Sequence, residues 1–192
     1  NIILLEAQPS GEIIKTRPAP SGWSDKAVEF ASGIDHLAAV LQEATAIINV
    51  PFLKTHNIAG MSGCLKNISH AMIRHPARFH GGGCNPYVGD IVAIPEIRDK
   101  LRLHLVNATR IVVDNGPQAR TEDIVPAQTL LLSRDPVAAD TIGQDILDAA
   151  RIRRNLPRLA SDAGKLPILT HAAAIGLGQN DPDALDHLKI IA

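Results

Sequence analysis

The sequence is poor in aromatic residues, with one Trp, one Tyr and three Phe among 192 positions. Proteins that bind single-stranded nucleic acid stack bases on such rings. The formal net charge of −1 also gives no overall attraction to nucleic acid or to an anionic membrane. We therefore expect neither nucleic acid nor a membrane as a partner, and the hydrophobic core has to be built from aliphatic side chains.

Cysteine and long apolar runs are also scarce. Cys64 and Cys84 alone cannot form a disulfide framework, a four-cysteine zinc site or a four-thiolate iron–sulfur site. No apolar run approaches the roughly 20 residues that a membrane helix needs. The chain starts at Asn1 without an initiator Met or a basic leader. We therefore expect a processed or truncated part of a longer chain, cytoplasmic unless an export signal has been removed.

The composition is otherwise ordinary, 45% hydrophobic and 20% charged, and suits a single domain over residues 1–192. Short aliphatic runs alternate with longer helical patterns, which predicts an α/β fold: a layered domain with a mostly parallel or mixed sheet flanked by helices. The predicted strands are Ile2–Leu5, Glu12–Lys15, Ala46–Leu53, Arg110–Asp114, Thr129–Ser133 and Leu188–Ile191. The predicted helices run from Lys26 to about Glu43, from about Gly60 to Arg74, from about Pro95 to Leu105, and from Pro136 to about Arg153.

Two of these elements allow sharper predictions. Ala46–Leu53 has aliphatic residues on both alternating faces, so we expect a largely buried strand with helices on both sides of the sheet. Asp135 and Pro136 follow the strand that ends at Ser133, with only Arg134 in between. Asp is a favoured N-cap and Pro is favoured at the first helical position, so this pair predicts the start of the last helix.

Charge is segregated along the chain. No acidic residue lies between Glu43 and Asp90, whereas four cations and four of the eight histidines do: Lys54, Lys66, Arg74, Arg78, His56, His70, His75 and His80. Such a stretch could arise by chance, or form one side of an interdomain or subunit contact. The alternative is a ligand site, because ligands of α/β folds collect at the carboxyl ends of strands and helix N-termini attract anions.

The arrangement of the basic residues favours the ligand site. The strand Ala46–Leu53 runs into Lys54 and His56, a glycine-bearing turn opens the next helix, and Lys66 lies one turn into that helix. We expect Lys54, His56 and Lys66 to converge on one concave site, with Asn67 close by, that binds a small anionic ligand. Arg151 and Arg153 should instead lie in open solvent, where they offset the negative end of their helix.

The histidines also raise a metal hypothesis. Residues spaced by five turn through about 500° on a helix, so His70, His75 and His80 cannot all be ligands from one helix. His80 and Cys84, joined by His56 across the fold, could bind a soft or borderline metal. The alternative is that these histidines face solvent or pair with anions, and no residue is assigned to a metal.

Three aspartates have both structural and functional interpretations. Asp114 either forms an ordinary turn or supplies a carboxylate at a strand end, as a base or metal ligand. Asp135 is expected to cap a helix. Asp140, in the first turns of the same helix, suits the positive end of the helix dipole.

Several motifs together resemble a known family. They are Ile48-Asn49-Val50-Pro51-Phe52-Leu53-Lys54-Thr55-His56, then Gly60 to Leu65-Lys66-Asn67, then Phe79-His80, and Asp135-Pro136-Val137-Ala138-Ala139-Asp140. In order and spacing they resemble the family of domain of unknown function 362, over roughly Ala39 to Leu147, with Asp114 and Gly116-Pro117 at matching positions.

The resemblance implies an α/β protein of undetermined activity. Some members are fused to ferredoxin-type iron–sulfur segments, some carry twin-arginine export signals, and relatives generally have further sequence before the part that begins here. By this match, eight residues occupy the family's motif positions. Of these we expect catalytic roles for His56, His80 and Asp114, and ligand-binding roles for Lys54, Lys66, Asn67, Asp135 and Asp140. The family supplies no reaction and no cofactor.

Three functions therefore remain open. The first is an α/β domain, enzymatic in character, that binds a small anionic ligand through Lys54 and Lys66 while His56 or His80 handles protons. The second is a redox accessory module in which the histidines and Cys84 hold a metal or face an iron–sulfur partner. The third is a noncatalytic interaction domain whose basic region docks an acidic protein surface, as a protein partner or in a homo-oligomer.

Overall fold

The computed structural model describes residues 3–7, 13–18, 20–161 and 164–185. The predicted strand Leu188–Ile191, and the first residues of the strands predicted at Ile2 and Glu12, lie outside these ranges. Two hairpins come first: β1 (Ile3–Ala7) with β2 (Ile13–Pro18), and β3 (Val28–Phe30) with β4 (Gly33–Asp35).

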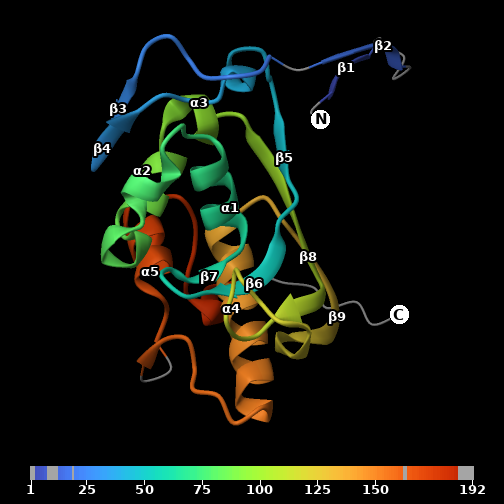
Figure 1. Ribbon diagram of the computed structural model, residues 1–192, viewed down its shortest axis with the longest axis vertical. Coiled ribbons are helices and arrows are strands. Elements are labelled where there is room, and N and C mark those ends of the chain that lie inside the picture. Colours follow the sequence, from blue (N-terminus) through green and yellow to red (C-terminus); the bar gives the residue numbers. More distant parts are fainter. Residues whose placement is uncertain (1–2, 8–12, 19, 162–163, 186–192) are drawn as a thin grey trace.

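A five-stranded mixed sheet forms the centre of the fold (Figure 1). Its strands are β5 (Ile47–Asn49), β6 (Phe52–His56), β7 (Gly60–Ser62), β8 (Leu101–Val112) and β9 (Ile124–Ser133). The long strand β8 pairs in parallel with β5 and β6 and antiparallel with β9, and β7 pairs antiparallel with β6. Helices follow as α1 (Cys64–Ala71), α2 (Tyr87–Val92), α3 (Pro95–Arg98), α4 (Pro136–Arg153) and α5 (Pro167–Ala174). The predicted α/β fold with a mixed sheet is therefore confirmed.

The strand predicted as Ala46–Leu53 is interrupted. β5 and β6 follow one another along one edge of β8, opposite β9, because Asn107 of β8 faces both Phe52 and Leu130. The break falls at Val50 and Pro51, where Pro51 accepts a backbone hydrogen bond from Asn107 but has no N–H to donate.

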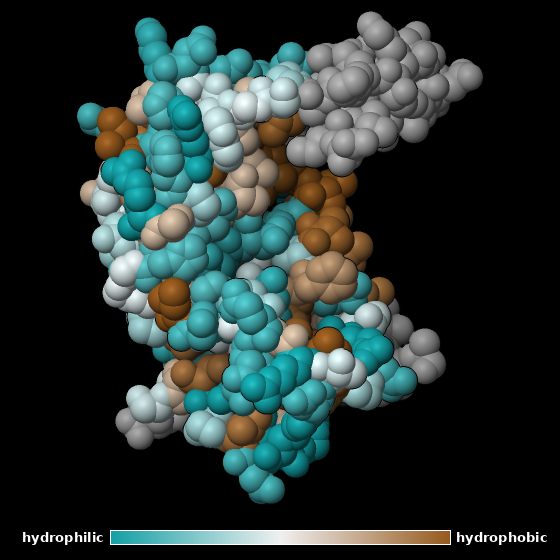
Figure 2. Space-filling view, viewed as in Figure 1, coloured by the Kyte–Doolittle hydropathy of each residue, from teal (hydrophilic) through white to brown (hydrophobic). Residues whose placement is uncertain are grey.

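The expectation of burial on both faces of that strand is wrong. Ile48 and Val50 are 63% and 56% exposed, and the other apolar side chains on this open face are Phe52, Leu130 and Leu132. Among the described residues, the helices lie on one side of β5, β8 and β9, and Figure 2 shows brown apolar side chains gathered on the other side, over β5 and β8. The alternate residues, such as Leu53 and Val106, point into the core beneath α4 and are 1% exposed.

The helix predicted from Lys26 to about Glu43 is also wrong. This segment forms the hairpin β3–β4 and a 3-10 turn at Ala39–Gln42. The apolar residues are spaced as in an amphipathic helix but do not lie on one. Leu37 and Leu41 each enter the core from a different part of the segment. Asp35 decides the outcome, because its buried carboxylate accepts hydrogen bonds from His36 and from both the backbone and the ring of His75.

Two further helices are shorter than predicted. The Gly60–Arg74 segment begins with the strand β7, and its helix α1 covers only Cys64–Ala71. The Pro95–Leu105 segment has a helix only at Pro95–Arg98, because Leu101 already starts the strand β8.

The predicted start of the last helix is confirmed. Asp135 is the N-cap of α4, and its Oδ1 accepts hydrogen bonds of 2.8 Å from the N–H groups of Val137 and Ala138. Pro136 occupies the first helical position, where the missing N–H leaves no intrahelical bond unmade.

The one-sided covering of the sheet leads to a matched prediction. Leu53→Ala should lower the free energy of unfolding by about 2–5 kcal/mol, because it leaves a cavity in the core. Leu132→Ala, at a side chain that is 67% exposed, should change it by less than about 0.5 kcal/mol. Urea denaturation of both variants measures the difference, and an equal loss would mean that something covers the open face in solution.

Candidate functional site

A cluster of basic side chains forms where β6, α1 and the following 3-10 turns meet. We call it the Lys/His cluster, and its members are Lys54, His56, Lys66, His70 and His80. His80 lies at its centre: its Nε2 is 3.3 Å from the Nζ of Lys66, and its ring stacks on that of His56 with centroids 5.7 Å apart. The ring of His70 meets that of His80 edge-on, with centroids 4.8 Å apart.

Lys54 joins the cluster through the geometry of its strand. Lys54 and His56 are two positions apart on β6, so both side chains leave the same face of the strand. The charge of Lys54 lowers the pKa of both His56 and Lys66. The structure thus brings Lys54, His56, Lys66 and His80 into one neighbourhood.

The hydrogen bonds determine which ring nitrogen of each histidine carries a proton. The Nδ1 of His56 accepts from the N–H groups of Ile58 and Ala59, both at 3.2 Å, so its proton lies on Nε2. The Nδ1–H of His80 donates to the carbonyl of Pro76 at 2.9 Å, which leaves the lone pair on Nε2, where Lys66 donates. His56 therefore presents a donor and His80 an acceptor.

Burial keeps the imidazoles of His56 and His70 neutral. It is the main cause that lowers the pKa of His56 to about 4 and that of His70 to about 3, and in both the charge of Lys66 is the next cause. The pKa of Lys66 is lowered by burial as well. At neutral pH, His56 cannot take up a proton, because Nδ1 is already bonded and its pKa is far below 7.

The cluster contains cations without carboxylate partners. Lys66 is only 7% exposed and His56 only 9%. None of the ion pairs formed by the described residues involves Lys54 or Lys66. Besides burial, the neighbours that lower the pKa of His56 are Lys66, His80 and Lys54, and no acidic side chain is among them.

The N-terminus of α1 is already occupied by an internal group. The carboxylate of Asp140, which is 1% exposed, accepts hydrogen bonds from the N–H groups of Cys64 and Leu65 at 2.5 and 2.9 Å. The expectation that free N–H groups at this end hold the ligand is therefore wrong. Gly63 permits the close approach, because a Cβ there would lie 2.1 Å from Asp140 Oδ1.

The other aspartates with predicted site roles are engaged elsewhere. Asp135 caps α4 through Oδ1, and its Oδ2 accepts from the N–H of Gln179 at 2.9 Å. The carboxylate of Asp114 lies 3.4 Å from a guanidinium nitrogen of Arg151. No contact between Asp114 and the Lys/His cluster is seen among the described residues, although Gly116 of the same turn bonds Thr55, next to His56.

Asn67 points away from the cluster. Its amide donates to the side-chain oxygen of Asn49 at 2.8 Å. Asn49 in turn donates to the carbonyl of Cys64 at 2.9 Å and contacts the buried ring of His104 at 3.1 Å. This network joins α1 to β5 and β8, so Asn67 supports the helix that carries Lys66.

The expectation of a solvent-exposed Arg151 is wrong. Arg151 is 9% exposed and donates to the carbonyls of Val113 and Pro157 in addition to its pairing with Asp114. It ties the end of α4 to β8. Arg153, two residues further on, is exposed as expected.

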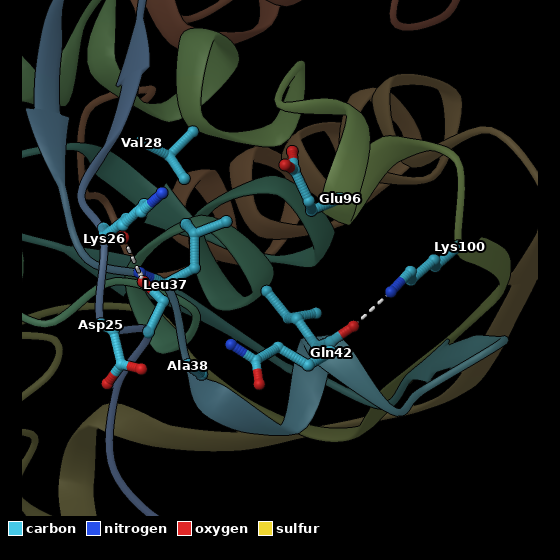
Figure 3. Close-up of a pocket in the computed structure, with 10 residues that line it drawn as sticks. Asp25, Lys26, Val28, Leu37, Ala38, Gln42, Glu96 and Lys100 are labelled. Atoms are coloured by element: carbon cyan, nitrogen blue, oxygen red, sulfur yellow. Dashed lines mark hydrogen bonds between the residues drawn. The ribbon is translucent and has the colours of Figure 1, made fainter.

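A pocket of about 400 Å³ lies elsewhere, beside β3 and the 3-10 turn at Ala39–Gln42 (Figure 3). Its lining includes two lysines, Lys26 and Lys100, and two acids, Asp25 and Glu96. Lys100 already donates to the carbonyl of Leu41. The mixed charges of this pocket do not select an anion, and it contains no predicted site residue.

The sequence grouped His80 and Cys84 with His56 as a possible metal site, whereas the structure brings His70 to His80 and Cys84. The ligand atoms of His70, His80 and Cys84 lie within 4.8 Å of one another. These three residues do not lie on one helix. They meet because α1 ends at Ala71 and the turn Pro76–Phe79 brings the chain back to α1. His75 is not part of this group, because its ring pairs with Asp35.

Asp140 leads to a prediction on pH dependence. Burial raises its pKa to about 6, above the ordinary 3.8, although the two N–H groups lower it. The folded state therefore holds this proton more tightly than the unfolded state does, and the resulting stability is present below about pH 4 and is lost as the pH rises through about 6. The free energy of unfolding of the parent minus that of Asp140→Asn should thus fall by up to about 3 kcal/mol between pH 4 and 7.

Urea denaturation at a series of pH values measures this difference. Asp25→Asn, at an exposed carboxylate, controls for the loss of an acid elsewhere. A difference between the parent and Asp140→Asn that stays constant or rises over this range would contradict the prediction.

No helix within the described ranges is long and apolar enough to cross a membrane.

The family of the chain follows from its similarity to known proteins. Searches of curated proteins and of solved structures found no match. The family model described as Domain of unknown function (DUF362) matches residues 16–145, more than half of the chain, a span that includes the whole Lys/His cluster. The resemblance seen in the motifs is confirmed, and the chain belongs to the DUF362 family.

Proposed function

We propose that the Lys/His cluster binds a small anionic ligand, a carboxylate or a phosphate, and that the domain is an enzyme acting on it. The observation that carries this proposal is Lys66, a lysine only 7% exposed whose ammonium group contacts the ring of His80 and takes part in none of the ion pairs of the described residues. Buried charges in proteins are normally paired, because leaving water without a counter-charge costs several kcal/mol. An anionic ligand would supply the missing partner.

The hydrogen-bond pattern fits such a ligand. Lys66 and Lys54 offer charged donors, and His56 offers a neutral donor at Nε2, fixed by the two N–H groups that its Nδ1 accepts. Charge-assisted hydrogen bonds contribute about 1.5–3 kcal/mol each. Two lysines that bind the ligand together would therefore give a measurable affinity for the anion, even though the site contains no arginine.

The two histidines then take different roles. His56 acts as a hydrogen-bond donor that orients or polarises the ligand, because its pKa of about 4 prevents it from acting as a base. His80 is the proton-handling residue, since its Nε2 lone pair accepts from Lys66 and can pass a proton between Lys66 and the ligand. Asp114, Asn67, Asp135 and Asp140 support neighbouring elements in this proposal.

Docking of an acidic protein surface is the competing function. An extended protein surface contacts exposed groups, whereas Lys66 and His56 are nine-tenths buried. The exposed cations Arg74 and Arg78 lie in the same segment and suit docking better. The two functions therefore depend on different residues, and variants can separate them.

The test compares binding of inorganic phosphate and of malonate to the parent, Lys66→Met, Lys54→Met and Arg153→Met by calorimetry. We expect loss of either cluster lysine to weaken binding about 10- to 150-fold, the equivalent of one charge-assisted hydrogen bond. Arg153→Met removes an exposed positive charge and should leave the affinity within about twofold.

Equal affinities in all four proteins would show that the anion binds outside the cluster. If no anion binds the parent, and Arg74→Ala with Arg78→Ala abolishes capture of an acidic protein, the docking function replaces the proposal. Circular dichroism of each variant verifies the fold.

A further inference from the structure

We propose that His70, His80 and Cys84 form a binding site for a borderline transition-metal cation of the zinc class. This site stands on different residues from those proposed to hold the anion, apart from His80. The inference therefore goes beyond the proposed function and does not depend on it.

The three ligand atoms are already gathered. They lie within 4.8 Å of one another, and a tetrahedral ion with nitrogen and sulfur ligands holds them about 3.3–3.6 Å apart. Side-chain rotations that move the ligand atoms by roughly 1 Å would bring them to these distances. Two imidazoles and one thiol, with no carboxylate among them, form a ligand set that suits zinc, cobalt, nickel or copper rather than magnesium or calcium.

His70 is the strongest single piece of evidence. Its Nε2 is buried and no well-formed hydrogen bond reaches it within the described residues, although the backbone of Phe79 lies near the ring; nearly all buried polar atoms in proteins have a full partner. Its Nδ1 is 3.0 Å from the hydroxyl oxygen of Ser69. A ring held by one nitrogen with the other left free is the arrangement of a metal-ligating histidine.

His80 shows the same arrangement. Its Nδ1–H donates to the carbonyl of Pro76 at 2.9 Å, which orients the ring and leaves the lone pair on Nε2. That lone pair currently accepts from Lys66. A metal ion would replace this hydrogen bond and release the ammonium group of Lys66 toward the open side of the cluster.

Cys84 is completely buried, at 0% exposure. Its φ of 62° lies in the left-handed region, which is unusual for a residue with a side chain, and Gly82 and Gly83 before it have φ values of 59° and 72°. This glycine-rich turn holds the cysteine in an uncommon conformation beside the two rings, and such conformations concentrate at functional sites.

His56 is not a ligand in this arrangement, although it was a member of the metal group considered from the sequence. Its Nδ1 lone pair is already used by the N–H groups of Ile58 and Ala59, and its Nε2 carries the proton. Three protein ligands leave a fourth position for water or an exogenous ligand, as in catalytic zinc sites.

Titration of the parent protein with Co²⁺ tests the site, because a cobalt–thiolate bond gives a strong near-ultraviolet charge-transfer band. We expect one equivalent to bind with this band, Cys84→Ser to lose the band, and His70→Ala to bind about 100-fold more weakly. Cys64→Ser and His75→Asn are the matched controls at the other cysteine and at a neighbouring histidine, and both should keep the band and the affinity. Competition with Zn²⁺ should abolish the signal.

Lys66→Met separates this site from the anion site. Removing the ammonium group that competes for His80 Nε2 should strengthen cobalt binding, whereas the same change should weaken binding of inorganic phosphate. The metal proposal is overturned if the parent binds no Co²⁺ stoichiometrically, or if Cys84→Ser and His70→Ala bind as the parent does. Circular dichroism of the variants distinguishes a lost ligand from a lost fold.

Discussion

The buried carboxylate of Asp140 holds the site together, because it accepts the first two N–H groups of α1 from its own place in α4. A carboxylate at this end satisfies donors that the helix cannot satisfy itself and also favours the helix dipole. The contact fixes α1 against α4. Lys66 lies in the first turn of α1 and His70 in the second. Without it, neither residue would be held at a set distance from His80, which lies on a separate loop.

This arrangement places the basic side chains of the Lys/His cluster in a partly buried position, without an acidic side chain beside them to balance their charge. The protein lowers the cost by keeping His56 and His70 neutral, since burial drives the pKa values of both well below 7. The charge of Lys66 remains to be balanced. Elsewhere in the fold, buried charges such as Arg151 and Asp35 have protein partners, so the unpaired lysine is a departure from the protein's own pattern. That contrast is the basis for placing a ligand here.

Local signals predicted what depends on neighbours in the chain. The cap at Asp135 and Pro136 and the α/β class followed from them, and so did the grouping of basic residues into one segment. What failed depends on distant partners. The hairpin at Val28–Asp35 is decided by bonds from Asp35 to His75, 40 positions away, and the N-terminus of α1 is occupied by Asp140, 76 positions from Cys64. The exposure of Ile48 depends on where the helices pack, which the aliphatic pattern of one strand does not contain.

The two proposed ligands use different atoms of the histidines except at His80, whose Nε2 handles the proton in the proposed function and binds the ion in the proposed metal site. The Nε2–H of His56 can donate to an anion but cannot bind a metal, whereas the Nε2 lone pair of His80, and that of His70 when its proton lies on Nδ1 beside Ser69, can bind a metal but repel an anion. The donor lies at the end of β6, beside Lys54, and the acceptors lie toward α1 and Cys84. A cation held by the second group would free Lys66 from His80, and its fourth coordination position would lie in the same neighbourhood as the lysine. An anion bound there would then contact the metal and the lysine together, and each ligand would strengthen the binding of the other by the same factor.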